Sequence, residues 1–222
     1  MKPSTPYSGR PATLVPYLLA FSISWALVGL LVLWAGNANL FLALNGLGNP
    51  WLDRLFGPLT WMGDGIFFAI ACCLLVAWHR RSGLASFAAF GLSSGLAQLL
   101  KRVFFDGWQR PKAFFADRQI EIYQPGGVEL FSYNSFPSGH TTSAFCLACL
   151  LAYFFPTPRV QVAVLVLAWG VGLSRIMQAQ HFPLDVLAGA MVGTAAALVV
   201  RDVFFKWRWP TTTLGRPKVP KP

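Results

Sequence analysis

The chain has 222 residues, of which 55% are hydrophobic and only 12% are charged. This composition excludes an ordinary soluble domain, which needs a charged surface around its apolar core, and indicates that part of the solvent is lipid. The net charge of +10 would suit a nucleic-acid-binding protein, but the basic residues lie between long apolar runs. We therefore expect an all-α integral membrane protein and no nucleic-acid partner.

Six apolar runs predict six transmembrane helices in a single membrane domain that comprises residues 1–222. Their lengths equal, or fall slightly below, the roughly 17–25 residues that a helix needs to span a bilayer. The runs are 13–35, 62–78, 84–100, 140–155, 160–174 and 183–205. All four cysteines lie inside these runs, where small apolar residues are common, so we expect neither a disulfide nor a metal site.

The first connecting segment, 36–60, is predicted to be an outer interfacial segment. Five of its apolar side chains recur at helical spacing around Asp53 and Arg54, which indicates a short amphipathic helix in the membrane interface. These side chains are Trp51, Leu52, Leu55, Phe56 and Leu59.

The longest connecting segment, 101–138, is interrupted by proline and glycine. It therefore predicts an outer cap loop over the membrane surface, with Tyr123 and Phe131 as candidate anchors.

The charges are divided unequally between the two ends of the predicted helices. Eleven of the 18 basic residues and only one acidic residue lie on the side that carries both termini, whereas the other side carries seven of each. By the positive-inside rule the tails, 1–12 and 207–222, are cytoplasmic. The excess of positive charge also favours attraction to anionic membrane lipids.

Four basic residues on the neutral outer side directly follow the third run, although topology does not require charges there. They are Lys101, Arg102, Arg110 and Lys112. The simplest explanation for fixed cations at the outer membrane surface is that they bind an anionic ligand.

If the helices pack as antiparallel neighbours, four helix ends meet at the outer boundary. They would gather three cations, two histidines and a carboxylate beside a Ser-Gly pair. These residues are Lys101, Arg110, Arg175, His140, His181, Asp185, Ser138 and Gly139. His140 lies in "YNSFPSGHTTSAF". Arg175, His181 and Asp185 lie in "SRIMQAQHFPLD".

This set of side chains suits a phosphate group. The planar guanidinium groups of Arg110 and Arg175 match phosphate oxygens, and Lys101 adds a point charge. Ser138 and Gly139 stand at the start of the fourth helix, where free backbone N–H groups and the helix dipole favour an anion. We therefore expect these five residues to bind phosphate.

The histidines suit phosphoryl transfer. His181 and Asp185 are four residues apart, on one helix face, so the carboxylate can accept the proton of one ring nitrogen and leave the other as a nucleophile. His140 can protonate the leaving oxygen and later activate water. Carboxylates for a magnesium site are lacking and a phosphohistidine route needs none, so we expect no cofactor.

Each signal alone also has a purely structural interpretation. A histidine near a helix end is usually a cap, which is our interpretation of His79, and a Ser-Gly pair before a helix is usually one too. Interfacial arginines usually extend to lipid headgroups, as we expect of Arg102 and Arg118. These interpretations leave unexplained the coincidence of three polar motifs at matching helix ends.

The motifs resemble those of the type 2 phosphatidic acid phosphatase family, whose helical core is shared with bacterial acid phosphatases and vanadium haloperoxidases. "KRVFFDGWQRP", "PSGH" and "SRIMQAQHFPLD" follow that family's order. The resemblance implies that His181 is the nucleophile, Asp185 its orienting partner and His140 the general acid. It implies phosphate binding by the other five residues, namely Lys101, Arg110, Ser138, Gly139 and Arg175.

The first motif departs from the family pattern. Eight residues separate Lys101 from Arg110, where the family usually has six. Either the loop carries a two-residue insertion at Gly107-Trp108, or Arg102 takes the place of the first cation.

Chemistry and resemblance together predict a phosphatase that hydrolyses a lipid (di)phosphate at the outer face of the bacterial cytoplasmic membrane. Undecaprenyl diphosphate is the favoured substrate, and its monophosphate, phosphatidylglycerol phosphate, phosphatidic acid and lipid A are alternatives. Two other hypotheses stay open, a phosphotransferase between lipid phosphates and a membrane protein that only binds an anion. The expected partners are the substrate and membrane lipids, and no obligate protein partner is evident.

Overall fold

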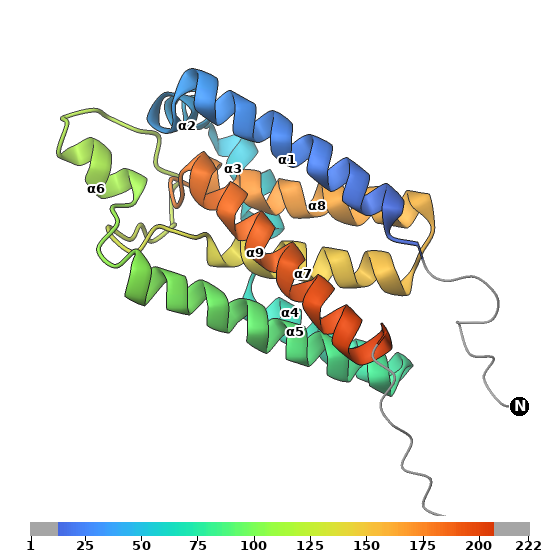
Figure 1. The fold of residues 1–222 in the computed structure, drawn as a ribbon. Coiled ribbons are helices and arrows are strands. Elements are labelled where there is room, and N and C mark those ends of the chain that lie inside the picture. Colours follow the sequence, from blue (N-terminus) through green and yellow to red (C-terminus); the bar gives the residue numbers. More distant parts are fainter. Residues whose placement is uncertain (1–12, 207–222) are drawn as a thin grey trace, which may run out of the picture.

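The computed structural model describes residues 13–206, so the predicted tails, 1–12 and 207–222, lie outside the described range. Within that range the chain folds into helices and loops without a strand (Figure 1). The α-helices are α1 (Val15–Ala35), α2 (Asn37–Asn45), α3 (Pro50–Trp61), α4 (Gly65–Trp78), α5 (Arg80–Leu99), α6 (Pro111–Ala116), α7 (Gly139–Phe154), α8 (Pro158–Met177) and α9 (Pro183–Arg201). Two π-helical turns, η1 (Leu100–Phe104) and η2 (Asp202–Lys206), continue α5 and α9.

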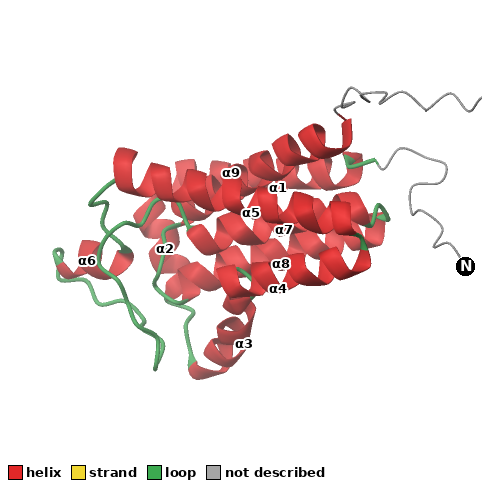
Figure 2. Ribbon diagram, turned by 90° about the horizontal axis from the view of Figure 1, so that it is seen from below, coloured by secondary structure: helices red, strands yellow, loops and turns green. Residues whose placement is uncertain are grey.

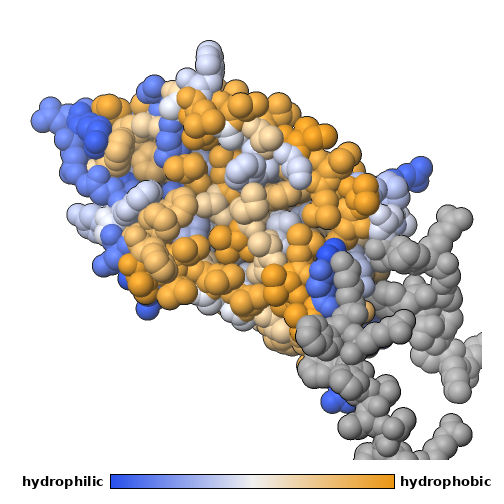
Figure 3. Space-filling model, viewed as in Figure 1, coloured by the Kyte–Doolittle hydropathy of each residue, from blue (hydrophilic) through white to orange (hydrophobic). Residues whose placement is uncertain are grey.

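Helix α7 forms the core of the bundle. Twelve of its 16 residues are buried, because it packs against α5, α8 and α9, whereas the peripheral α1 buries only three of its 21 residues. Hydrophobic side chains cover the middle of the molecular surface, and hydrophilic ones gather toward its ends (Figure 3). A surface of this kind fits a bilayer, with lipid replacing water around the outer helices.

Four helices of the described part are long and apolar enough to cross a membrane. They are α1, α5 with η1, α8, and α9 with most of η2. Helices α3 and α4 together form a fifth candidate, bent by 50°, and α7 is a shorter apolar helix. The chain is therefore a helical membrane protein, as predicted, while the count of six spans stays a prediction.

The break between α3 and α4 was not predicted from the apolar run 62–78. Helix α4 starts anew at Gly65 because the side chain of Asp64 accepts a hydrogen bond from the N–H of Ile66, at 2.7 Å.

The region 36–60 is helical in two pieces, α2 and α3, and Trp51 and Leu55 of α3 are exposed. Whether α3 lies in the membrane interface stays a prediction.

The long loops and α6 lie together at one end of the bundle (Figure 2). The start of α1 and the end of α9 lie at the opposite end (Figure 1). Two parts of the predicted cap loop 101–138 are helical, because η1 carries the third apolar run on to Phe104 and α6 begins at Pro111.

Asn45 and Tyr123 fasten this loop to the bundle. The buried Asn45 side chain accepts a hydrogen bond from the N–H of Tyr123 (2.9 Å) and donates to the carbonyls of Tyr123 (3.1 Å) and Met177 (3.3 Å). The Tyr123 hydroxyl donates to Asp53 at 2.5 Å, and this bond raises the pKa of the phenol. The loop is thereby tied to α2, α3 and the end of α8.

Helices α7 and α9 approach closely through glycines. A Cβ atom added to Gly189 would lie 2.6 Å from the carbonyl oxygen of Ser138, and one added to Gly193 would lie 2.2 Å from that of Thr142. No larger residue fits without moving a backbone, so these glycines set the distance between the two helices.

Candidate active site

His181 lies buried in the turn before α9, with only 2% of its surface exposed. Its Nδ1 atom is 3.5 Å from Oδ2 of Asp185, one turn into the helix. The geometry is not that of a hydrogen bond, and Nδ1 has no hydrogen-bond partner within residues 13–206. The predicted pair is thus brought together, with room for the carboxylate to accept the ring proton after a small shift.

The carboxylate of Asp185 is held in place by two donors. Its Oδ2 atom accepts hydrogen bonds from the hydroxyl of Ser135 at 2.5 Å and from the N–H of Phe182 at 2.8 Å. The second bond closes the first turn of α9, as in a capping box. Ser135 was missed in the sequence, because nothing in its spacing connects it with a residue 50 positions away.

Ser138 joins the start of α7 to the start of α9. Its N–H donates to the carbonyl of Asp185 at 3.0 Å, while its hydroxyl accepts from Thr141 Oγ1 at 2.8 Å and from the Thr141 N–H at 3.4 Å. Gly139, predicted to bind phosphate with Ser138, is the first residue of α7. The N-terminal end of α7, with its partial positive charge, therefore lies beside the His181 turn.

Two glutamines of the last motif hold the predicted arginines. Arg110 donates from Nη1 to the Gln180 side chain at 2.8 Å, and from Nε to the carbonyl of Tyr133 at 3.0 Å. Arg175 donates from Nη1 to the Gln178 side chain at 3.1 Å and to the Thr60 hydroxyl at 2.7 Å.

The Nε atom of Arg175 is buried and has no hydrogen-bond partner in the described part of the chain. An unpaired guanidinium donor in a buried site is costly unless a ligand accepts from it. Gln178 and Gln180 were not predicted to contact the arginines, although their position between Arg175 and His181 could have suggested it. Nothing in the sequence indicated that Thr60 contacts Arg175.

Of the two candidates for the first cation of the first motif, Lys101 contributes to the lowered pKa of His181. Lys101 is partly buried in the π-helical turn η1, whereas Arg102 is exposed. This difference in burial favours Lys101, and its role in phosphate binding stays a prediction. Between Lys101 and Arg110 the chain makes a turn, in which the N–H of Gly107 donates to the Asn134 side chain at 3.2 Å.

His140, in the first turn of α7, faces a carboxylate that the sequence did not reveal. Its Nε2 atom is 3.9 Å from Oδ2 of Asp64, the residue whose other oxygen caps α4. The α3–α4 break can lie this close because Gly63 has no side chain, and a Cβ there would be 2.7 Å from the carbonyl oxygen of His140. Asp64 is therefore placed to orient the His140 ring.

The site favours the neutral form of His181. Burial lowers the pKa of this imidazole well below 6.5, and the nearby charges of Arg110, Arg175 and Lys101 lower it further. A neutral ring keeps a lone pair for nucleophilic attack at physiological pH. The same three cations would attract an oxyanion to the face of the ring.

Several proteins that are named as phosphatases are similar to this chain. A model of the PAP2 superfamily matches residues 82–209. A Bacillus licheniformis protein named bacitracin transport permease protein BcrC is 46% identical over 174 residues, 74% of this chain and 78% of that protein. Undecaprenyl-diphosphatase BcrC of Bacillus subtilis is 27% identical, with 77% of this chain and 83% of that protein covered.

A lipid A 1-phosphatase of Rhizobium johnstonii is 34% identical over 134 residues, 60% of this chain. The match covers 51% of that protein, so the chain spans about half the length of this relative. Among solved structures, the crystal structure of Aquifex aeolicus LpxE has a TM-score of 0.65 at 26% identity. That match covers 74% of this chain and 93% of the LpxE chain.

We expect the His181 ring to stay neutral well below pH 6.5, because protonation would add a positive charge to a buried site beside three cations. NMR spectra of protein with ¹⁵N-labelled histidine, assigned with His181→Ala, report the protonation of each ring. A His181 ring that titrates near 6.5, as an exposed histidine does, would contradict the burial and charge of the site.

Proposed function

Because the chain belongs to the PAP2 superfamily and is a membrane phosphatase, we propose that it hydrolyses a lipid (di)phosphate through a phosphohistidine on His181. The observation that carries this proposal is the buried imidazole of His181, whose Nδ1 atom lies 3.5 Å from the Asp185 carboxylate and whose pKa is lowered by burial and by three nearby cations. A neighbouring carboxylate and fixed positive charges suit a nucleophile that attacks a phosphorus atom.

The reaction takes two steps. In the first, Nε2 of His181 attacks phosphorus, the bond from phosphorus to the leaving oxygen breaks, and His140 gives its proton to that oxygen. The Nδ1 proton stays on the ring, and Asp185 stabilises the positive charge by accepting a hydrogen bond from Nδ1–H. In the second, His140 takes a proton from water, the resulting hydroxide attacks phosphorus, and the bond to His181 breaks to release inorganic phosphate.

Phosphate binding falls to groups that the structure leaves available. The unpartnered Nε of Arg175, the Lys101 ammonium and the N-terminal end of α7 at Ser138 and Gly139 are suited to the phosphate oxygens. Arg110 is anchored by Gln180 on one side of its guanidinium and can turn its remaining donors to the ligand. These groups would stabilise the negative charge that develops on the phosphoryl oxygens in the transition state.

We place the site on the outer face of the bacterial cytoplasmic membrane. The excess of basic residues assigns the ends that carry the termini to the cytoplasm, and the site lies at the α7 start, near the end of the bundle with α6. The substrate is then a lipid phosphate presented to the outer leaflet.

Undecaprenyl diphosphate is the proposed substrate. An outward-facing site in a compact chain suits it, and the Bacillus subtilis relative named undecaprenyl-diphosphatase BcrC matches over 77% of the chain. The lipid A 1-phosphatase relative supports lipid A as the alternative. Phosphatidylglycerol phosphate and phosphatidic acid offer the same phosphate chemistry.

Substitution of the two histidines tests the mechanism. Phosphate release from a lipid phosphate by purified protein should be lost in His181→Ala, and kcat should fall roughly 10²–10⁴-fold in His140→Ala, the usual contribution of a general acid and base. His79→Ala is the matched control, because His79 caps α5 at the end remote from Lys101. Undiminished release by His181→Ala would disprove the phosphohistidine route.

A panel of purified lipid phosphates tests the substrate. We expect kcat/KM for phosphate release to be highest for undecaprenyl diphosphate, compared with its monophosphate, phosphatidylglycerol phosphate, phosphatidic acid and lipid A. A higher value for any other member would overturn the substrate but not the reaction. Transfer of radiolabel to an acceptor lipid, in place of free phosphate, would show a phosphotransferase.

A further inference from the structure

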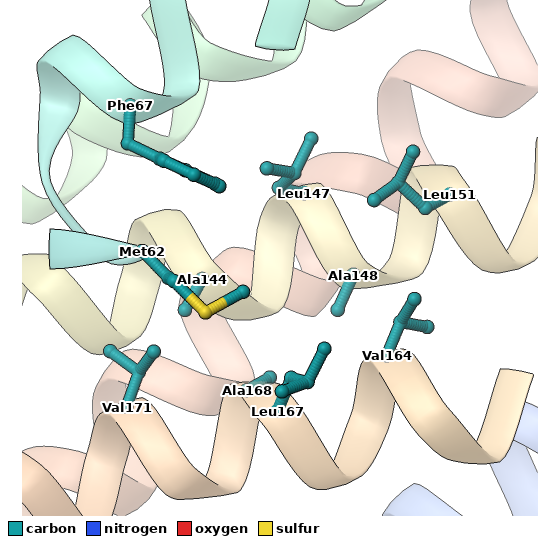
Figure 4. A pocket seen from close by; sticks show the side chains of 10 residues that line it. All are labelled: Met62, Phe67, Ala144, Leu147, Ala148, Leu151, Val164, Leu167, Ala168 and Val171. Atoms are coloured by element: carbon teal, nitrogen blue, oxygen red, sulfur yellow. The ribbon is translucent and has the colours of Figure 1, made fainter. Parts of the chain in front are cut away.

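An apolar groove lies between α4, α7 and α8 (Figure 4). Its volume is about 90 Å³. Ala144 and Ala148 of α7 face Ala168 of α8, and these small side chains leave the space between the two helices open. Phe67 of α4 and Leu167 of α8, which are 36% and 42% exposed, stand where the groove meets the lipid-facing surface.

The upper end of the groove adjoins the catalytic residues. Ala144 lies one helical turn after His140 on α7, and Val171 lies one turn before Arg175 on α8. At Gly63 a Cβ atom would lie 2.6 Å from Val171 Cγ1 and 2.7 Å from the His140 carbonyl oxygen. Gly63 thus packs against both the groove residue Val171 and the backbone of His140.

We propose that this groove holds one hydrocarbon chain of the lipid whose phosphate occupies the site. The proposal rests on the proposed function, and it names the part of the protein that recognises the lipid tail. All the side chains that line the groove are apolar, which suits a hydrocarbon and not a headgroup. From Ala144 to Leu151 helix α7 rises about 10 Å, so the groove has room for the first part of a long chain.

The benefit of such a groove is position more than affinity. A chain that leaves the bilayer for a protein groove exchanges one apolar environment for another, so little hydrophobic free energy is gained. A chain fixed between α7 and α8 instead sets the depth and direction of the attached phosphate relative to His140 and Arg175. Correct placement of the reacting atoms is a main source of catalytic rate.

A second apolar crevice, of about 390 Å³, is the competing site. It lies between α1, α2, α8 and α9 and is lined by Val28, Trp169 and Ile176, among others. Its α8 residues lie on the face of that helix opposite Val171, because they are offset by about half a helical turn. This crevice lies beside the start of α9, through Pro183 and Val186, and its lining does not include Ala144 or Ala148 of α7.

Photo-crosslinking distinguishes the two places. The probe is a long-chain alkyl phosphonate, which cannot be hydrolysed, with a diazirine about 10 Å along the chain, the length of the α7 wall. We expect adducts on residues 144–151 and 164–171. Adducts on α1 and α2, or spread evenly over the lipid-facing side chains, would overturn the proposal.

Filling the groove supplies the matched variants. Ala148→Leu, and independently Ala168→Leu, should remove the adducts, whereas Val28→Leu in the second crevice should keep them. Retained adducts in both groove variants would contradict the proposal. Phosphate release from a short-chain phosphate, which does not reach the groove, shows that each variant is folded.

Wild-type protein that releases phosphate but gives no groove adducts disproves the tail site alone. Absence of release from every lipid phosphate disproves the proposed function.

Discussion

The close contact between α7 and α9 is the constraint on which the site depends. The proposed nucleophile, His181, and its carboxylate lie at the start of α9, while the proposed general acid, His140, lies at the start of α7, so the proposed reaction needs both helices. Gly189 and Gly193 let the two backbones approach, and the N–H of Ser138 then reaches the carbonyl of Asp185. Without a hydrophobic force between helices in lipid, such small-residue contacts are what hold a membrane bundle together.

Around this contact the protein builds a layer of polar side chains that hold the catalytic groups before a substrate arrives. Ser135 fixes Asp185, Gln180 fixes Arg110, and Gln178 with Thr60 fixes Arg175. A guanidinium held in this way loses little freedom when phosphate binds, so its charge is already aimed at the place where negative charge develops. The bend between α3 and α4 contributes to this layer through Thr60 and Asp64.

The sequence predicted the helical membrane architecture, and it pointed to motif residues that the structure brings close together. Long apolar runs and the histidine, arginine and lysine motifs are local patterns, and local patterns can be read without a structure. The central position of α7 was not predicted, because its 16 residues are too few to distinguish a core helix from a span. The Asp64 carboxylate and Ser135 were missed for a related reason, since each meets its partner across at least 50 positions that no periodicity connects. Burial favours Lys101 over Arg102 as the first cation, and spacing in the sequence does not report burial.

The most direct test of the α7–α9 contact is the turnover of Gly189→Ala. The added Cβ would press against the carbonyl of Ser138 and move the start of α7, and a displacement of about 1 Å can lower kcat by roughly 10²-fold. Gly91→Ala, on α5, is the control, because a Cβ there meets nothing within 4 Å. The measurement is kcat for phosphate release per folded molecule, with folding followed by thermal unfolding in detergent. A large loss in Gly189→Ala, with Gly91→Ala unchanged, is expected, and wild-type turnover by Gly189→Ala would show that the site does not depend on this contact.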